Sequence, residues 1–257
     1  MNLQPSNANV VVGADGIHSA IREAVLGAES PRFSGSIAYR GLVPAERLQH
    51  LGLEVNASAW LGPDRHFVHY YVAGGRLVNF VAVAPTDDWR IESWSAKGEV
   101  SDALAEFADW HPQVREIISA VNMTNRWALY DRDPLERWTV GRVTLLGDAA
   151  HAMLPFMAQG AVQAIEDAAV LAKCLEGVDR TTVPSALRRY EEIHKPRASQ
   201  VQAYARRNGT VFHLPDGEAQ RQRDAHLAAA VGSNPLLDST WLYAHDVEAE
   251  LAADRYR

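Results

Sequence analysis

Two glycines and an aspartate, set between an apolar run and a helical pattern, form the strongest candidate site in this sequence. Residues 143–146 are typical of a buried strand, Gly147 and Asp148 follow it, and Gly160 precedes an alanine-rich helical pattern over 161–175. A helix N-terminus offers unpaired N–H groups and about half a unit of positive charge, so it favours an anionic ligand. The Asp148 carboxylate can accept hydrogen bonds from sugar-like hydroxyls. The alternative is an ordinary strand-to-helix turn in which the glycines serve backbone geometry alone.

A histidine and a tyrosine are candidate substrate contacts. The pattern predicts a strand over 66–72, joined by a Gly-Gly turn to another strand over 77–83. Period-two geometry places His66 and Tyr70 on one face, where an imidazole can bind or deprotonate a phenol and a phenol can hydrogen-bond a carboxylate. Alternatively both rings pack on the sheet or face water. His69 takes the role of His66 if the assigned face is wrong.

An Asp-Gly pair near the start of the chain is a third candidate. It follows a short buried strand predicted over 10–14, and Gly16 permits a tight turn after that strand. Asp15 can hold Arg22 or an ordered water molecule. Further along, Arg40 either lines the substrate side of the protein or forms a structural salt bridge.

Both motifs resemble those of a known enzyme family. Residues 147–168 read Gly-Asp-Ala-Ala-His-x-x-x-Pro-x-x-x-Gln-Gly-Ala-x-x-Ala-Ile-Glu-Asp-Ala, and residues 10–22 read Val-Val-Val-Gly-Ala-Asp-Gly-Ile-His-Ser-Ala-Ile-Arg. The first is similar to the second flavin-binding motif of single-component FAD-dependent aromatic hydroxylases of the salicylate hydroxylase type. The second resembles the Asp-Gly motif of that family, near the FAD pyrophosphate and the path of the nicotinamide cofactor. The resemblance covers nearly the whole chain.

The resemblance implies a cofactor set, a reaction and a set of site residues. FAD and NAD(P)H are the implied cofactors, and O2-dependent hydroxylation of a phenolic or N-heteroaromatic acid is the implied reaction. Relatives carry a His-x-x-x-Tyr pair in a matching hairpin, so His66 and Tyr70 become the catalytic pair. Asp148 would contact the ribitol chain, and Pro155 would fix the loop along the flavin ring. The implied cofactor-binding residues are Asp15, Gly16, Gly147, Asp148, Pro155, Gly160, Ala161 and Val162.

Residues around the second motif receive supporting roles. His151 is expected to shape the loop or to lie near the cofactor. Glu166 and Asp167 are expected to complement the helix dipole and to anchor the neighbouring loop. Several relatives have a histidine where this chain has Phe156, which indicates a more apolar pocket wall.

The family's first dinucleotide-binding segment has no counterpart in this sequence. The strand–Gly-x-Gly-x-x-Gly–helix unit is missing, and the polar residues 1–7 lead almost directly into the Asp-Gly motif. We therefore expect a truncated hydroxylase with an incomplete FAD-binding domain. The alternatives are a misassigned start, a non-catalytic remnant, and a module that binds an aromatic ligand without stably bound FAD.

Composition and patterning set the fold class. The 257 residues are 47% hydrophobic and 22% charged, with a net charge of −7, which argues against a nucleic-acid-binding role. One cysteine excludes an intrachain disulfide and fits a cytoplasmic protein, no apolar run can span a membrane, and no metal-ligand spacing occurs. A homodimer is kept as an alternative to a monomer. We expect a mixed α/β fold: a remnant Rossmann-like FAD-binding domain (1–30 and 143–180), a substrate-binding sheet domain (31–142) and a C-terminal helical region (181–257).

Overall fold

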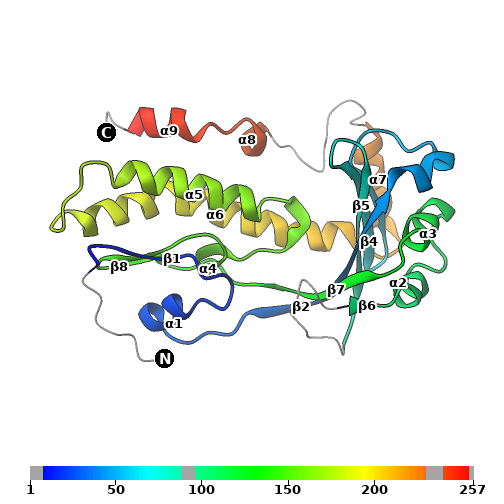
Figure 1. Cartoon of the computed structure of the whole chain (residues 1–257), viewed down its shortest axis with the longest axis horizontal. Coiled ribbons are helices and arrows are strands. Elements are labelled where there is room, and N and C mark those ends of the chain that lie inside the picture. Colours follow the sequence, from blue (N-terminus) through cyan, green and yellow to red (C-terminus); the bar gives the residue numbers. More distant parts are fainter. Residues whose placement is uncertain (1–7, 88–96, 230–239, 255–257) are drawn as a thin grey trace. The chain divides into compact units, whose positions relative to one another are not determined.

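The computed structural model describes residues 8–87, 97–229 and 240–254, which form two compact units. Unit 1 comprises residues up to 32, 130–209 and 226 onwards, and unit 2 comprises 33–129 and 210–225. Figure 1 shows the elements of both units in chain order. Compared with the expected three-part division, residues 130–142 and most of the C-terminal region fall in unit 1. In the described part of the chain, no helix is both long and apolar enough to cross a membrane.

Unit 1 is built on a three-stranded sheet with the order β1-β9-β8. Strands β1 (Val11–Gly13) and β9 (Val143–Leu145) run parallel, and β8 (Thr139–Val140) is antiparallel to β9. This register brings the ends of the Asp-Gly and Gly-Asp strands to the same edge of the sheet. The helices of this unit are α1 (Ala20–Leu26), α4 (Asp148–His151), α5 (Gly160–Cys174), most of α6 (Val183–Phe212), α8 (Thr240–Tyr243) and α9 (Val247–Asp254), with a 3-10 turn η2 (Pro155–Met157).

The core of unit 1 lies between this sheet and the helices α5 and α6. Trp138, Leu145, Leu187 and Tyr190 are fully buried there. Pro196 lies inside α6, which continues uninterrupted across it. A proline in a helix interior removes one backbone hydrogen bond, so the packed residues of α6 must compensate for that loss.

Unit 2 is a six-stranded sheet with the order β3-β4-β5-β2-β7-β6. One face of the sheet packs against two helices and a 3-10 helix through a core that includes Tyr39, Phe67, Phe80 and Phe107. The strands are β2 (Arg32–Pro44), β3 (Ser58–Gly62), β4 (Arg65–Val72), β5 (Leu77–Pro85), β6 (Lys97–Gly98) and β7 (Thr124–Asp131). The helices are η1 (Ala45–Leu51), α2 (Val100–Glu106), α3 (Pro112–Ser119) and most of α7 (Glu218–Ala229).

The predicted hairpin is confirmed in unit 2. Strands β4 and β5 pair antiparallel from His66↔Val83 to Val72↔Leu77. Both turn glycines have positive φ, 66° at Gly74 and 83° at Gly75, which is the conformation a tight hairpin turn demands. The mixed α/β fold class is also confirmed, because helices and two separate sheets make up the described residues.

Candidate functional site

The Gly-Asp motif places an exposed carboxylate beside the N-terminus of a 15-residue helix. Gly147 has φ of 62°, a backbone that favours glycine, and it caps the short helix α4, which begins at Asp148. The Asp148 side chain is exposed, and a Cβ built on Gly160 would lie 4.0 Å from its Oδ1. The N-cap of α5, Gln159, makes no side-chain capping hydrogen bond. The N-terminus of α5 therefore has no side-chain cap and lies next to a carboxylate, an arrangement that suits a ligand with both an anionic edge and hydroxyls.

The loop that begins at Gly147 is anchored by Asp167, which lies on α5. Its Oδ2 accepts hydrogen bonds from the Gly147 backbone N–H at 2.8 Å and from His151 Nε2 at 2.6 Å. Its Oδ1 accepts the Tyr190 hydroxyl at 2.8 Å. Asp167 and His151 are fully buried, so these bonds form in a low-dielectric environment. The expectation that Asp167 anchors the neighbouring loop and that His151 shapes it agrees with these contacts.

The ionisable groups of this buried cluster shift one another's pKa values. Burial by itself raises the pKa of Asp167, but the hydrogen bonds from His151 and Gly147 and the charges of His151 and His194 together outweigh burial, and the pKa lies below its ordinary value. Burial, reinforced by the Asp167 charge, raises the pKa of the Tyr190 hydroxyl well above its usual range. Burial lowers the pKa of His194, whose Nε2 lies 3.3 Å from Asp167 Oδ1. An ionised aspartate with a neutral tyrosine as donor is the consistent state.

His151, Asp167 and His194 also meet the distance condition for three metal ligands. However, the 2.6 Å separation of His151 Nε2 from Asp167 Oδ2 is that of a hydrogen bond. Two ligand atoms on a tetrahedral zinc ion stand about 3.3 Å apart. The carboxylate also already accepts hydrogen bonds from Gly147 and Tyr190. His151 and Asp167 are therefore assigned to hydrogen bonding within the protein, whereas neither ring nitrogen of His194 has a hydrogen-bond partner among the described residues.

Two buried arginines join the Asp-Gly motif to the Gly-Asp motif. Arg22 donates to the carbonyl of Ile17 at 2.8 Å and to that of Ala149 at 3.2 Å. Arg132 donates from Nε to the same Ile17 carbonyl at 3.1 Å, and its backbone N–H donates to the Ala152 carbonyl at 3.3 Å. Each arginine is only 3% exposed. The loops after β1 and β9 are thus tied together by charge-assisted hydrogen bonds.

Of the two contacts expected of Asp15, the one with the Arg22 guanidinium is replaced by bonds within its own turn, and the one with an ordered water stays a prediction. The Asp15 carboxylate accepts the Ser19 hydroxyl at 2.5 Å and the Ile21 backbone N–H at 3.2 Å, while Ser19 caps α1 by accepting from the Arg22 N–H. The Arg22 guanidinium bonds backbone carbonyls instead of Asp15. The following residue, Gly16, has φ of 80°. Asp15 therefore orders the turn that leads into α1.

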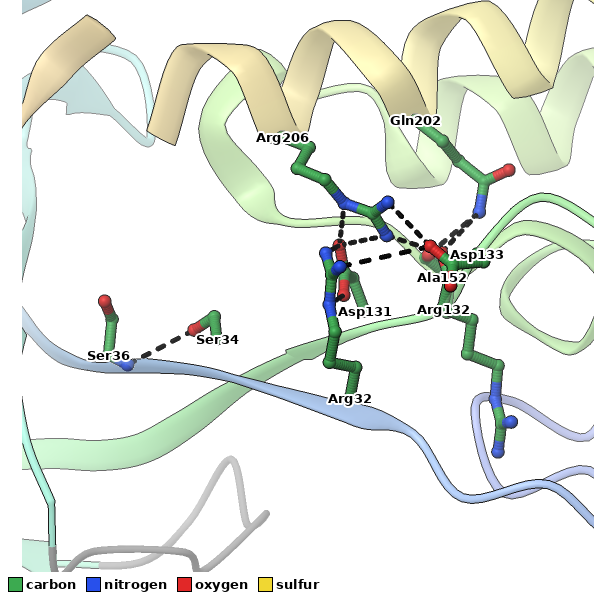
Figure 2. A network of polar contacts seen from close by, with 9 residues as sticks. All are labelled: Arg32, Ser34, Ser36, Asp131, Arg132, Asp133, Ala152, Gln202 and Arg206. Atoms are coloured by element: carbon green, nitrogen blue, oxygen red, sulfur yellow. Dashed lines mark hydrogen bonds and ion pairs between the residues drawn. The ribbon is translucent and has the colours of Figure 1, made fainter. Parts of the chain in front are cut away.

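A second ionic network, shown in Figure 2, holds the start of β2 and the end of β7 against α6. Asp131 is 2% exposed and accepts two hydrogen bonds from Arg32, at 3.0 and 2.9 Å, and one from Arg206 Nε at 2.9 Å. Arg206 also reaches Asp133 at 2.7 Å, and Gln202 donates to the Ala152 carbonyl at 3.1 Å. The network thus supports the segment that follows α4. The sequence analysis missed it; the acidic-basic-acidic run 131–133 after a strand was the available signal.

The remaining predicted residues of unit 1 lie around the same helix. Pro155 begins the turn η2, in which Phe156 is 9% exposed, and Ala161 and Val162 belong to the first turn of α5. Val162 is 40% exposed and Ile165, one turn later, is 70% exposed. Exposed apolar side chains and a helix N-terminus without a side-chain cap therefore occur together at this end of α5.

In unit 2, the register places His66 and Tyr70 on one face of β4, as predicted. His69 lies on the opposite face, 4% exposed, with its ring 5.9 Å from that of Phe67. His66 Nδ1 lies 2.6 Å from His213 Nε2, and the two rings stack at 4.9 Å. The partner His213 was missed, because nothing local relates it to a strand 147 residues away.

The paired histidines are both held neutral. Burial, with a contribution from the neighbouring ring's charge, lowers the pKa of His66 to about 3. Burial lowers the pKa of His213 to about 4. One ring must therefore donate its N–H to the other at neutral pH, and His66 offers a neutral imidazole on this face of the sheet.

The fold and these contacts define a two-unit α/β protein with a glycine-aspartate loop suited to a hydroxyl-rich, anionic cofactor. The family model described as "FAD binding domain" matches residues 6–205. The chain belongs to this family of FAD-binding domains. The predicted relationship is thereby confirmed.

Named relatives and solved structures agree with the family. The chain is 48% identical over 239 residues to 3-amino-4-hydroxybenzoate 2-monooxygenase PtnB3 of Streptomyces platensis, covering 93% of this chain and 59% of that protein. It is 41% identical over 206 residues to 6-hydroxynicotinate 3-monooxygenase of Bordetella bronchiseptica, covering 78% of this chain and 53% of that protein. A salicylate hydroxylase–substrate complex superposes with a TM-score of 0.82 at 31% identity, covering 95% of this chain and 63% of that one. The chain thus spans about three fifths of the length of these proteins.

Proposed function

We propose that this protein is an FAD-dependent monooxygenase that hydroxylates a phenolic or N-heteroaromatic acid with NAD(P)H and O2. The observation that carries the proposal is the exposed Asp148 carboxylate beside the uncapped N-terminus of α5, in a chain of the FAD-binding family. Relatives named as monooxygenases of 3-amino-4-hydroxybenzoate and 6-hydroxynicotinate support the choice of substrate class. The single cysteine and the net charge of −7 support a cytoplasmic protein that binds no nucleic acid.

The residues of unit 1 fit FAD by their donors and acceptors. Asp148 would accept hydrogen bonds from the ribitol hydroxyls, and the N–H groups of Gly160, Ala161 and Val162 would stabilise the negative edge of the reduced ring. Pro155 would fix the loop beside the ring, and Asp15 and Gly16 would shape the turn near the pyrophosphate. Bound FAD supplies the activation of O2 and the oxygen transfer, which no side chain of the protein can perform.

The residues of unit 2 would bind and orient the aromatic ring. His66, neutral because its pKa is about 3, can accept a hydrogen bond from a ring hydroxyl and increase its electron density without taking the proton outright. His213 would fix the tautomer of His66 through their 2.6 Å contact. Tyr70 would add a hydroxyl that donates to the substrate.

The test is turnover with defined products. The purified chain, supplied with FAD, NADH or NADPH, and 3-hydroxybenzoate or 6-hydroxynicotinate under 18O2, should give a product one labelled oxygen heavier, detected by mass spectrometry. Nicotinamide oxidation without labelled product, or no stimulation by either acid, would contradict the proposal. The same outcome, together with retained binding of the aromatic acid, would favour a binding module instead.

A further inference from the structure

The sheet face that carries His66 and Tyr70 has three rows of side chains across strands β2, β5 and β4. Residues directly opposite one another in antiparallel strands project from the same face. The pairing of β2 with β5 and of β5 with β4 fixes the rows. They are Leu42–Asn79–Tyr70, Arg40–Val81–Val68 and Ala38–Val83–His66.

The two ends of this face differ in exposure. At the His66 row, the Phe212 ring makes an edge contact at 5.4 Å and His213 stacks on the imidazole, so His66 is 3% exposed. At the other end, Leu42 is 50% exposed, Arg40 is exposed and Tyr70 is half-buried. The face is therefore closed over the imidazole and open around the guanidinium.

The guanidinium of Arg40 is oriented by a buried amide. Arg40 Nε donates to Asn79 Oδ1 at 2.9 Å, and Asn79 is fully buried in the middle strand. Asn79 Nδ2 has no hydrogen-bond partner among the described residues. A buried amide with an unpaired N–H2 destabilises a sheet that an aliphatic side chain would stabilise, so its presence calls for another reason. Orienting the exposed Arg40 supplies that reason, because its Nε is bonded to Asn79 and its two terminal nitrogens match a carboxylate in a bidentate geometry.

We propose that Arg40, oriented by Asn79 and accompanied by Tyr70, binds the carboxylate of an aromatic acid, whose ring lies over Val81 and Val68. The identity of this ligand rests on the proposed function. Arg40 and His66 stand on strands two spacings apart, about 10 Å. The ring therefore lies at the open end of the face beside Tyr70, and His66, covered by Phe212 and His213, lies at the other end. This subsite selects aromatic acids over neutral phenols.

The experiment measures binding of an acid and its neutral analogue to the full chain, without flavin. By calorimetry, 3-hydroxybenzoate should bind at least ~10-fold more tightly than 3-hydroxybenzamide, because only the acid forms a charge-assisted bidentate pair. Arg40→Gln should weaken binding of the acid at least ~10-fold and leave binding of the amide within about 2-fold, and Arg40→Lys should restore part of the preference. Arg76→Gln, an equal loss of charge at the exposed hairpin tip, is the matched control and should bind as wild type.

Equal affinity for the acid and the amide, equal effects of the Arg40 and Arg76 variants, or no saturable binding of either ligand would overturn the subsite. Discrimination that depends on Arg40 in a chain that yields no hydroxylated product would keep the subsite and contradict the proposed function. Hydroxylation of 3-hydroxybenzoate that is unchanged in Arg40→Gln would support the proposed function and contradict the Arg40 subsite.

Discussion

Single buried polar residues hold the candidate cofactor loop in place. The carboxylate of Asp167 satisfies the Gly147 N–H, the His151 ring and the Tyr190 hydroxyl at once. Buried charges are stabilising only when they are fully paired, and Asp167 meets that condition. Asp167 therefore links the backbone at the start of the Gly-Asp motif to helix α5.

Asp167→Asn should lower the free energy of unfolding by about 3 kcal/mol at pH 7. The buried donors of Gly147, His151 and Tyr190 would then face a neutral amide instead of a carboxylate. The pKa of Asp167 is lowered in the folded state, so its contribution is present above about pH 4 and is lost as the pH falls further. Urea denaturation measures the change. Glu192→Gln, at an exposed position of α6, is the control. A loss below about 0.5 kcal/mol would show that the cluster does not stabilise the fold.

The stacked pair His66–His213 predicts a second pH dependence. Both folded pKa values, about 3 and about 4, lie below the unfolded value near 6.5, so the unfolded chain binds more protons between these limits. Stability should therefore be complete above about pH 6.5 and fall as the pH drops toward 4. Urea denaturation at pH 7 and pH 5 should show a smaller loss for the His66→Gln/His213→Gln double variant than for wild type. An equal or larger loss in the double variant would show that His66 and His213 do not cause this pH dependence.

Among the helices, α5 is the one whose N-terminus the proposed cofactor would approach. It lacks a side-chain cap, and it begins with a glycine whose missing Cβ leaves space near Asp148. The nearest atom to a Cβ at Gly160 is the exposed Asp148 Oδ1, at 4.0 Å, which is ordinary contact. The glycine is therefore not required by packing within the protein.

Gly160→Ala should separate stability from cofactor binding. Alanine is a better helix former than glycine by up to about 1 kcal/mol, so the melting temperature should stay the same or rise. FAD affinity should fall by about 5-fold or more, because the methyl group keeps the ring from the backbone N–H groups. Differential scanning calorimetry and quenching of flavin fluorescence give the two readouts. Unchanged FAD affinity would place the cofactor elsewhere.

Patterns within short stretches of sequence predicted the elements that form within those stretches. The β4–β5 hairpin and the shared face of His66 and Tyr70 followed from alternation and a Gly-Gly turn. By contrast, the pairing of Asp131 with Arg206 joins residues 75 positions apart, and no periodicity relates them. Long-range ion pairs of this kind arise only once the strand and helix have packed.

At the scale of the whole molecule, the site in unit 1 depends on buried arginines that connect segments far apart in sequence. Arg132 bonds the Ile17 carbonyl 115 residues earlier, and Arg22 bonds the Ala149 carbonyl 127 residues later. The two motifs are recognisable in sequence because each is continuous. The arginines that join the two motifs could not be recognised in the sequence, because an isolated arginine does not indicate which residue it will contact.

The chain belongs to a family of FAD-binding domains and spans about three fifths of the length of its relatives, so its own affinity for FAD is the decisive property. Titration of FAD into the purified chain, followed by flavin fluorescence, should show saturable binding. Asp148→Asn should weaken it by about 10-fold or more, the loss expected for hydrogen bonds to a charged group, while Glu192→Gln should not. Absence of saturable binding, or equal affinity in the Asp148 and Glu192 variants, would show that this chain does not hold FAD at Asp148.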